Sequence, residues 1–364
     1  RVVGVGVTLD DLLLVLRVVR LDGGHVQGRG EVVDDRVEHR LHAAVLERRT
    51  AQHRVELAAD GEAAPAPNRT QDRSAPHVPG PAQVVFANEP DTDPSLYRAA
   101  RIDRLCDSRF ADINAPRDLA RAVAGFRPDL IIHMAAQAIV RDGYDRPAET
   151  FATNVLGTAN VLEIARAHRD SLSGVIVVTS DKCYENREWD WGYRETDRLG
   201  GRDPYSASKA CTELVAEAYR QSFFADPAGP QLATVRAGNV IGGGDWSPFR
   251  LIPDIVRATL EGRETVIRNP ASLRPWQHVL EPLAGYLSIG AAMLEGRGTE
   301  VAGAWNFGPD SEAAVPVGTL CAMLAEAWGE GGPRFRVEPP PNAPHEAGIL
   351  RLDSTKARQR LGWQ

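Results

Sequence analysis

Long apolar runs and closely spaced cysteines are both absent from this 364-residue sequence. The longest apolar stretches, such as Leu12–Leu16, are far shorter than the roughly 20 residues that a membrane-spanning helix needs. The four cysteines stand at positions 106, 183, 211 and 321, so none forms a Cys-x-x-Cys pair, and the nine histidines form no cluster at ligand spacing. We therefore expect neither a membrane partner nor a metal site.

An excess of positive charge is absent as well. The net charge is −7 and the isoelectric point is about 5.8, so a nucleic acid or an anionic membrane surface is not expected as a partner. No charged and then apolar leader precedes a small-residue cleavage site, which leaves a cytoplasmic location as the default expectation. The overall content of apolar and charged residues is ordinary for a globular protein.

Residues 1–85 lack aromatic residues, Ile, Lys, Met and Cys, although they hold five of the nine histidines. Such a segment has little with which to fill a dense core. The stretch 62–81 is rich in Ala, Pro, Asn, Arg and Ser, as in linkers or disordered chain. We interpret residues 1–80 as an unassigned segment that is disordered or translated from a shifted frame, since the Arg-rich sequence is typical of a GC-rich gene.

A glycine-rich phosphate loop is also missing from this segment. Val2–Val7 is compatible with a strand, and Gly4 and Gly6 match the start of a Gly-x-Gly-x-x-Gly loop. The third position is Leu9, however, and two aspartates follow it where a pyrophosphate would lie. The glycines at 23, 24, 28 and 30 precede no suitable helix. We therefore expect the first βα unit of a nucleotide-binding fold to be missing or replaced.

From Pro81 onward the pattern changes to apolar strands that alternate with helices. Strands are predicted at 83–87, 129–133, 174–179 and 232–236, and helices at 154–168 and 205–220. Continuously apolar strands of this kind indicate a parallel sheet covered on both faces, and so an α/β fold with a doubly wound, Rossmann-type sheet. In such sheets the chemistry lies beyond the carboxyl ends of the strands, where polar motifs follow in this sequence.

Two of these motifs carry groups suited to proton transfer. Tyr205 and Lys209 are four residues apart on a predicted helix and share a face, so the ammonium is expected to lower the pKa of the phenol from about 10 toward neutrality. Ser180, Asp181 and Lys182 follow the strand 174–179 and add a hydroxyl, a carboxylate and a second ammonium. Taken alone, the first motif also fits a surface Tyr and Lys, and the second a capping turn.

The helix 205–220 also carries an apolar stripe that we expect to face the core. Its members are Ala207, Ala210, Cys211, Leu214, Val215 and Ala218.

Nine stretches together resemble the extended short-chain dehydrogenase/reductase family and, within it, the CDP-glucose 4,6-dehydratases. They are 93–97, 133–137, 149–155, 179–187, 205–209, 236–246, 274–279, 305–309 and 345–347. Ser180–Glu188 and Gly238–Trp246 are long and unusual enough to favour this group over its relatives. The dTDP-glucose dehydratases are expected to carry Asp-Glu where this chain has Asp181 and Lys182.

The resemblance implies a reaction on a small-molecule nucleotide sugar with NAD as cofactor. Tyr205, assisted by Lys209 and Ser180, is implied to take the proton of the sugar 4-hydroxyl while hydride leaves C4. Asp181 is implied to protonate the departing 6-hydroxyl, and hydride then returns to C6. Lys182 stands where relatives have the glutamate that removes the C5 proton, and we assign it that role.

Binding residues follow from the same resemblance. The cofactor contacts implied are Asp112, Ile113, Ala135, Ala136, Gln137 and Thr153, together with Tyr205 and Lys209. The substrate contacts implied are Asn239, Arg250, Arg274 and Asn306, and the planar guanidinium of Arg274 suits a diphosphate. These residues divide the chain into an incomplete NAD-binding, Rossmann-like domain over 81–240 and a nucleotide-sugar-binding domain over 241–364.

Alternatives remain open at this point. One is a sister enzyme, either another nucleotide-sugar dehydratase or an epimerase, although an epimerase needs no acid for water loss. Another is a catalytically dead binding or assembly subunit that lacks the NAD phosphate loop. The family commonly pairs the two helices that follow Asn154 and Tyr205 between subunits, so a homodimer or homotetramer is expected.

Overall fold

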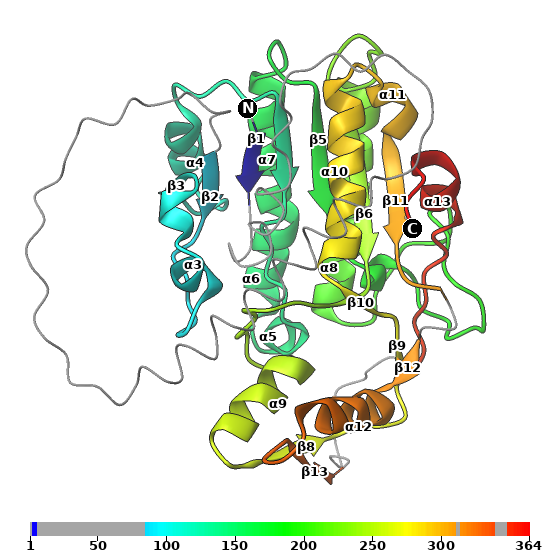
Figure 1. The fold of residues 1–364 in the computed structure, drawn as a ribbon. Coiled ribbons are helices and arrows are strands. Elements are labelled where there is room, and N and C mark those ends of the chain that lie inside the picture. Colours follow the sequence, from blue (N-terminus) through cyan, green and yellow to red (C-terminus); the bar gives the residue numbers. More distant parts are fainter. Residues whose placement is uncertain (1, 6–83, 311–313, 339–347) are drawn as a thin grey trace, which may run out of the picture. The chain divides into compact units, whose positions relative to one another are not determined.

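The computed structural model of the protein describes residues 2–5, 84–310, 314–338 and 348–364. Within these residues seven strands form one parallel sheet in the order β11-β6-β5-β4-β1-β2-β3. The strands are β1 (Val2–Val5), β2 (Val84–Ala87), β3 (Asp107–Phe110), β4 (Leu130–His133), β5 (Gly174–Val178), β6 (Gln231–Ala237) and β11 (Gly303–Phe307). Figure 1 shows β1, β5 and β11 running in the same direction. The expected Rossmann-type α/β fold is confirmed.

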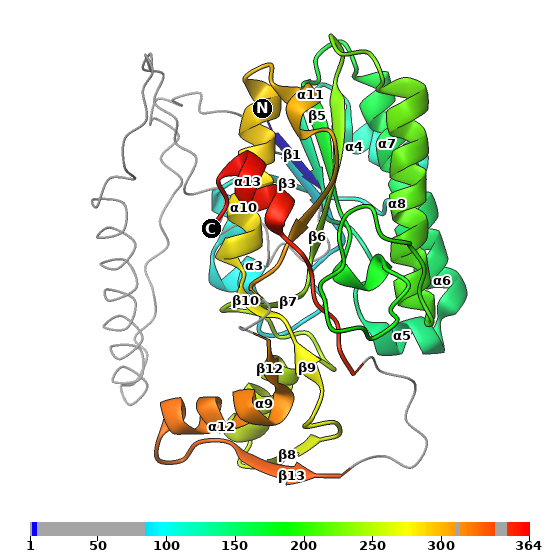
Figure 2. The same cartoon turned by 90° about the vertical axis from the view of Figure 1, so that its right-hand side faces the viewer.

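Helices cover both faces of this sheet. Helix α10 (Leu280–Leu294) lies on one face, while α7 (Gly157–Ala167) and α8 (Pro204–Phe223) lie on the other, with the sheet between them (Figures 1 and 2). Because both faces are covered, β4 is buried along its whole length, and so is β5 except at Val178. This double burial explains why these strands read as unbroken apolar runs rather than alternating patterns.

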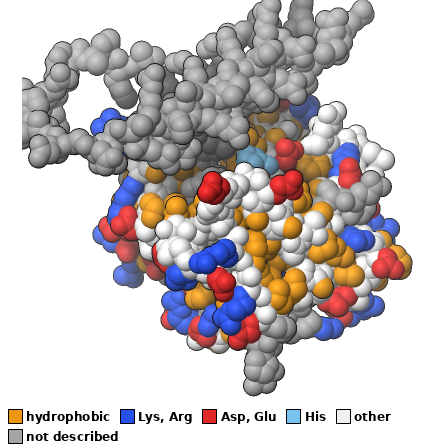
Figure 3. Space-filling view, turned by 60° about the horizontal axis from the view of Figure 1, so that its bottom comes forward, with side chains coloured by type: hydrophobic (Ala, Val, Ile, Leu, Met, Phe, Trp, Pro, Cys, Tyr) orange, Lys and Arg blue, Asp and Glu red, His pale blue; other side chains and the backbone are white. Residues whose placement is uncertain are grey.

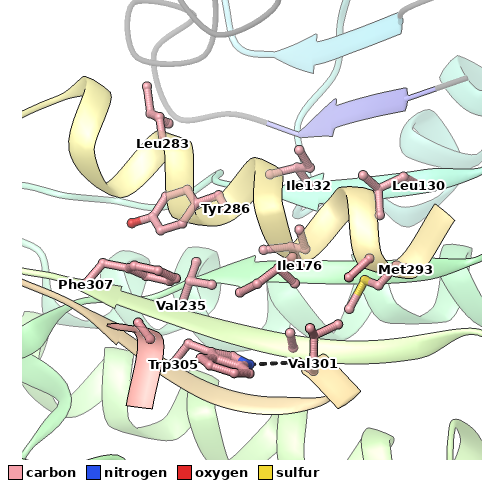
Figure 4. Packing of buried hydrophobic residues seen from close by; sticks show 14 of the residues in the cluster. Leu130, Ile132, Ile176, Val235, Leu283, Tyr286, Met293, Val301, Trp305 and Phe307 are labelled. Atoms are coloured by element: carbon pink, nitrogen blue, oxygen red, sulfur yellow. Dashed lines mark hydrogen bonds between the residues drawn. The ribbon is translucent and has the colours of Figure 1, made fainter. Parts of the chain in front are cut away.

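The core under α10 is filled by large side chains from the helix and the strands. In Figure 4, Leu283, Tyr286 and Met293 of α10 lie against the side chains of β4, β5 and β6. Trp305 on β11 is fully buried, and its indole N–H donates to the Val301 carbonyl over 2.7 Å. The one polar group of the Trp305 side chain therefore has a hydrogen-bond partner, while its carbon atoms pack against the core.

The predicted helix and strand positions are confirmed, but the predicted orientation of α8 is wrong. Of the six residues in the expected apolar stripe only Ala210 is buried, and Leu214 is 59% exposed. The side facing the sheet instead includes Lys209, Thr212 and Glu213. Each of these has a buried partner on a neighbouring element, so burial of polar groups is tolerated there.

Of the first βα unit, which we expected to be missing or replaced, the structure describes the strand, while the turn and helix that would follow it lie outside the described residues. Val2–Val5 forms β1 at the centre of the sheet, where Val3 pairs with both Ile131 of β4 and Val84 of β2. The edges of β2 and β4 that face each other carry backbone N–H and C=O groups inside the protein. These groups need hydrogen-bond partners, and β1 supplies them on both sides. The rest of the segment 1–80, with its glycines and its predicted disorder or frameshift, lies outside the described residues.

The C-terminal part adds three two-stranded sheets. These pair β7 (Asn239–Ile241) with β10 (Trp276–His278), β9 (Leu273–Arg274) with β12 (Val315–Pro316), and β8 (Glu264–Ile267) with β13 (Arg334–Val337). Helices α9 (Leu251–Leu260) and α12 (Val317–Trp328) pack on the last pair through a small core. Although β11 lies in the segment 241–364, it extends the main sheet, and the division at residue 240 stays a prediction.

Shorter helices complete the described part of the chain. They are α3 (Leu96–Ala99), η1 (Ile102–Arg104), α4 (Pro116–Val123), α5 (Val140–Asp145), α6 (Pro147–Phe151), η2 (Ala152–Leu156), η3 (Asp181–Cys183), α11 (Gly298–Val301) and α13 (Thr355–Leu361). None of the helices in the described residues is long and apolar enough to cross a membrane. In Figure 3, basic and acidic side chains of the described residues lie interspersed with apolar ones.

The central place of β1 predicts that a proline at Val3 destabilises the protein. Proline removes a backbone N–H from the interior of the sheet and leaves a carbonyl unpaired, which costs about 1–3 kcal/mol of unfolding free energy. Val3→Ile keeps the N–H and a β-branched side chain, and is the matched control. Chemical denaturation of both variants measures the effect, and equal stability of Val3→Pro and Val3→Ile would contradict the position of β1.

Candidate active site

A tight turn at the carboxyl end of β5 presents the first group of polar side chains. Ser180 caps the short helix η3, and its hydroxyl accepts a hydrogen bond from the Lys182 N–H over 3.2 Å. The same hydroxyl donates to Oδ1 of Asp181 over 3.0 Å. Ser180 and Asp181 are both buried, while Lys182 is half-buried. The cap therefore holds the serine and the aspartate together at the sheet edge.

The first turn of α8 faces this turn. Asp203 caps the helix by accepting from the Ser206 N–H over 2.9 Å, and Pro204 occupies the first helical position, so the helix starts just before Tyr205. Tyr205 is hydrogen-bonded to Ser180, and Nζ of Lys209 donates to the Val178 carbonyl over 3.3 Å. The structure thus brings together Ser180, Asp181, Tyr205 and Lys209, as the sequence predicts.

Asp181 is the most unusual group of the site. It is 3% exposed, and among the described residues its Oδ2 atom has no hydrogen-bond partner. Burial raises the pKa of Asp181, although Lys182, the Ser180 hydroxyl and Arg274 each act in the opposite direction. A carboxyl group in such surroundings retains a proton more readily than an exposed aspartate, which is what a general acid requires.

Gly238 leaves room beside that carboxyl. The residue follows β6, and a Cβ at this position would lie 2.7 Å from Cγ of Pro275 and 3.2 Å from Oδ2 of Asp181. Any larger residue would therefore press on the acid or on the strand connection at Pro275. The glycine allows the three segments to approach one another.

The expected lowering of the Tyr205 pKa is wrong. Burial dominates and raises the pKa of Tyr205 to about 12, with Asp181 and Asp203 acting in the same direction. The hydrogen bond between Tyr205 and Ser180 and the charge of Arg250 oppose this rise. Burial also lowers the pKa of Lys209 to about 8, while Glu213 on the same helix raises it. Sequence spacing indicates which groups meet, but it does not indicate how strongly burial opposes their charge.

Arg274, Arg250 and Asn239 surround the same edge of the molecule. Arg274 on β9 is buried, lowers the pKa of Asp181 through its charge, and donates to the Leu273 carbonyl over 2.9 Å. Arg250 forms an ion pair with Asp245 at 3.1 Å, and its charge acts to lower the pKa of Tyr205. Asn239 begins β7, opposite Trp276 of β10. The three predicted substrate residues thus lie on the segments that follow β6 and line this side of the site.

Asn306 does not belong to this group. Its side chain is 0% exposed, and its amide group donates to the carbonyls of Tyr193 and Asp353 and accepts from the Tyr184 hydroxyl. All its strong hydrogen-bonding positions are in use within the protein, so the structure does not support the expected contact with a nucleotide sugar. The resemblance predicts a substrate contact for Asn306, but the residue lies in the core on β11.

The predicted cofactor residues come from several elements: Asp112 and Ile113 follow β3, Ala135, Ala136 and Gln137 follow β4, Thr153 lies in η2, and Tyr205 and Lys209 lie in α8. A pocket of about 610 Å³ is lined by Asn88, Glu89, Arg109, Phe110, Ala111, Asp112, Asp118, Arg121 and Ala122. Asp112 accepts from the Asn114 N–H over 2.8 Å, and Nδ2 of Asn114 donates to Oγ1 of Thr153 over 3.1 Å. The side chain of Ile113 is buried beneath α7, so only its backbone and the edge of its side chain can contribute to a ligand site.

Asn154 is a site residue that the sequence reasoning missed. Its Oδ1 accepts from the Gln137 N–H over 2.7 Å, while Nδ2 donates to the Gln137 carbonyl and to Oγ of Ser208. It therefore fixes the loop Ala135, Ala136 and Gln137 after β4 and ties it to α8. In the sequence, Asn154 stands at the start of the predicted helix 154–168 and within the stretch 149–155 that carries the resemblance.

The chain is similar in sequence to known nucleotide-sugar dehydratases. The model of the family described as GDP-mannose 4,6 dehydratase matches residues 93–364. The chain is 47% identical over 283 residues to a CDP-glucose 4,6-dehydratase of Salmonella typhimurium, covering 76% of this chain and 77% of that protein. It is 27% identical over 295 residues to a dTDP-glucose 4,6-dehydratase of Neisseria gonorrhoeae, covering 74% and 81% respectively.

Solved structures of similar fold agree with the architecture. A dTDP-glucose 4,6-dehydratase from Streptomyces venezuelae, solved with NAD bound, superposes with a TM-score of 0.65 at 24% identity, covering 79% of this chain and 83% of that chain. A UDP-glucose 4-epimerase from Thermotoga maritima gives a TM-score of 0.63 at 20% identity, covering 78% and 85%. These likenesses establish a shared fold.

The raised pKa of Asp181 predicts that Asp181→Asn stabilises the protein at neutral pH. A carboxyl group whose pKa is raised on folding makes the folded state less stable as pH rises from its ordinary value of 3.8 through the raised value. The neutral amide of asparagine is not destabilised in this way. The stability of Asp181→Asn relative to the wild-type protein should therefore rise with pH between the two pKa values and then level off, at a difference on the order of 1 kcal/mol. Thermal unfolding from pH 4 to 8 measures it.

The matched control for this measurement is Asp170→Asn, which changes an exposed aspartate. The control should show no pH-dependent gain over the wild-type protein. A stability difference for Asp181→Asn that stays constant across the whole pH range would contradict the buried, protonatable state of the carboxyl.

Proposed function

Because the chain belongs to the GDP-mannose 4,6-dehydratase family, we propose that it is a CDP-glucose 4,6-dehydratase, which converts CDP-glucose to CDP-4-keto-6-deoxyglucose. The observation that carries this proposal is the buried Asp181, whose pKa is raised and whose Oδ2 atom has no partner in the described residues, beside Ser180 and Tyr205. A 4,6-dehydration needs an acid for the leaving hydroxyl, whereas an epimerisation does not. The site is therefore suited to water loss.

The residues present fit NAD at its adenosine end. A pocket of about 610 Å³ lies where β2 and β3 end, next to the point at which the strand order reverses between β1 and β4. Asp112 would face the adenosine, while Ala135, Ala136, Gln137 and Thr153 would line the path toward Tyr205 and Lys209. When bound, NAD supplies an acceptor for the hydride of sugar C4 and returns that hydride to C6.

Tyr205 is the group that would receive the proton of the sugar 4-hydroxyl. Its phenolate is favoured by the hydrogen bond with Ser180 and by the charge of Arg250. Lys209, whose pKa is about 8, carries its positive charge at neutral pH one helical turn away. Ser180 and Arg250 partly oppose the burial that disfavours the phenolate, and Lys209 would add its charge from the same helix.

Asp181 and Lys182 would then divide the loss of water between them. Oxidation at C4 acidifies the C5 hydrogen, which Lys182 in its neutral form would remove as a base, while Asp181 would protonate the departing 6-hydroxyl. The two residues are adjacent on η3, with Asp181 buried and Lys182 half-buried. Arg274, Arg250 and Asn239 would hold the nucleotide diphosphate, with Arg274 offering two parallel donors.

The cellular setting belongs to the same proposal. We expect the enzyme to act in the cytoplasm in deoxysugar biosynthesis, including that of O-antigen sugars, on a diffusible nucleotide sugar. A homodimer or homotetramer would bury the exposed apolar residues of the region around α7 and α8, among them Leu156, Leu214 and Phe223. Another nucleotide sugar as substrate, or a dead binding subunit, is an outcome that the assay below would reveal.

Incubation with CDP-glucose and NAD tests the proposal directly. Mass spectrometry should show a product that has lost one water, and deuterium placed at C4 of the glucose should appear at C6. Asp181→Asn should lower kcat by about 10²–10⁴, the usual contribution of a general acid. Preferred turnover of dTDP- or UDP-glucose would overturn the choice of substrate, and no turnover with bound NAD would indicate a dead relative.

Substitution of Lys182 tests its role at C5. Lys182→Met should abolish dehydration and the entry of solvent deuterium at C5, because no base remains. Lys182→Arg keeps the charge but cannot act as a base at neutral pH, so it should fail equally. Lys182→Glu restores the Asp-Glu pair expected in dTDP-glucose dehydratases and should retain part of the activity. Unchanged kcat in Lys182→Met would exclude it as the base.

A further inference from the structure

A fully buried ion pair lies directly beneath the proposed active site. Glu213 of α8 and Arg236 of β6 are 4% and 3% exposed at their side chains, and they meet through two hydrogen bonds of 2.8 and 2.9 Å. This parallel, two-point contact is the strongest geometry available to a carboxylate and a guanidinium. Neither residue has a place in the chemistry described so far.

The pair holds both ends of the turn that carries Ser180 and Asp181. At the start of the turn, the Thr179 hydroxyl donates to Oε1 of Glu213. At its end, the Tyr184 hydroxyl accepts from Nη1 of Arg236 over 2.7 Å and its ring lies under the guanidinium. Four residues separate these two anchors, and they include the proposed acid and base. Movement of the ion pair would therefore move the whole turn.

Glu213 also shares a face of α8 with the other chemical groups. Tyr205, Lys209 and Glu213 are spaced at successive four-residue steps, so their side chains follow one another along the helix. Lys209 is buried, and the groups facing it are Glu213 on its own helix and Cys183 on η3. The carboxylate opposes the loss of the Lys209 proton that burial favours.

A purely structural explanation accounts poorly for this arrangement. Buried ion pairs are seldom a net source of stability, because removing two charges from water offsets most of their attraction. Here the carboxylate has accumulated four donors: two from Arg236, and the hydroxyls of Thr179 and Thr234. This many donors keep Glu213 ionised in a buried site.

We propose that Glu213 is a positioning residue of this enzyme, which fixes the turn 179–184 at both ends together with Arg236 and supplies the counter-charge for Lys209. The proposal rests on the proposed function only for its kinetic consequence. Its electrostatic part concerns the folded chain and can be measured without turnover.

The direct test follows the titration of Lys209 by NMR. The chain contains only three lysines, Lys182, Lys209 and Lys356, so labelling lysine with ¹³C at Cε gives three signals. The variants Lys182→Arg and Lys356→Arg assign two of them. In Glu213→Gln the midpoint of Lys209 should fall by roughly one pH unit, because Glu213 is a charge that opposes the effect of burial on Lys209. Glu217→Gln, one turn further along α8, is the matched control and should leave it unchanged.

A double variant guards against loss of folding. Glu213→Gln leaves Arg236 as an unpaired buried charge, whereas Glu213→Gln combined with Arg236→Gln removes both charges. The lowered Lys209 midpoint should persist in the double variant if Glu213 supplies the counter-charge. A wild-type midpoint in the folded double variant would overturn the proposal.

The kinetic test separates this inference from the proposed function. With CDP-glucose, the alkaline limb of the kcat profile should move to lower pH in Glu213→Gln, with KM changed less than kcat, and Glu213→Asp should restore part of the rate. An unshifted limb would refute the kinetic role. If the wild-type protein turned over no nucleotide sugar, the proposed function would fail while the lysine titration would still decide the electrostatic part.

Discussion

The parallel pairing of β5 with β4 and β6 is the constraint on which the site depends. It places the end of β5 beside the end of β6, so that the Val178 carbonyl receives Lys209 and Thr179 reaches Glu213. Helix α8 then crosses the same strand ends and delivers Tyr205 to Ser180. A shift of one residue in the register of this sheet would turn these side chains to the opposite face, and the contacts of Lys209 and Thr179 would be lost.

Much of this fold was predictable because its signals are local. Strands buried on both faces leave continuous apolar runs, and β4, β5 and β6 were predicted to within a residue or two of their bounds. The position of β1 was not predictable in the same way. Val2–Val5 forms a strand because it fits between β2 and β4. These two strands lie far from it in the sequence, so its neighbouring residues alone do not predict the strand.

The site shows the same division between local and distant causes. The grouping of Ser180, Asp181, Tyr205 and Lys209 could be predicted, since each stands at a strand end or at helical spacing. The direction of the Tyr205 pKa and the saturation of Asn306 could not, because both arise from neighbours far away in the chain. The buried polar side of α8 could not be predicted either, because its hydrogen-bond partners lie on β5, β6 and η2, far away in the chain.

The place of β1 also bears on how the chain reaches its fold. The strand at the centre of the sheet is formed by Val2–Val5, yet one of its two partners begins at Leu130. Closing so long a loop carries a large entropic cost before any pairing compensates for it, which slows folding in proteins dominated by distant contacts. Val2–Val5 can therefore pair on both sides only after β4 has been synthesised, although its pairing with β2 needs only residues up to Ala87.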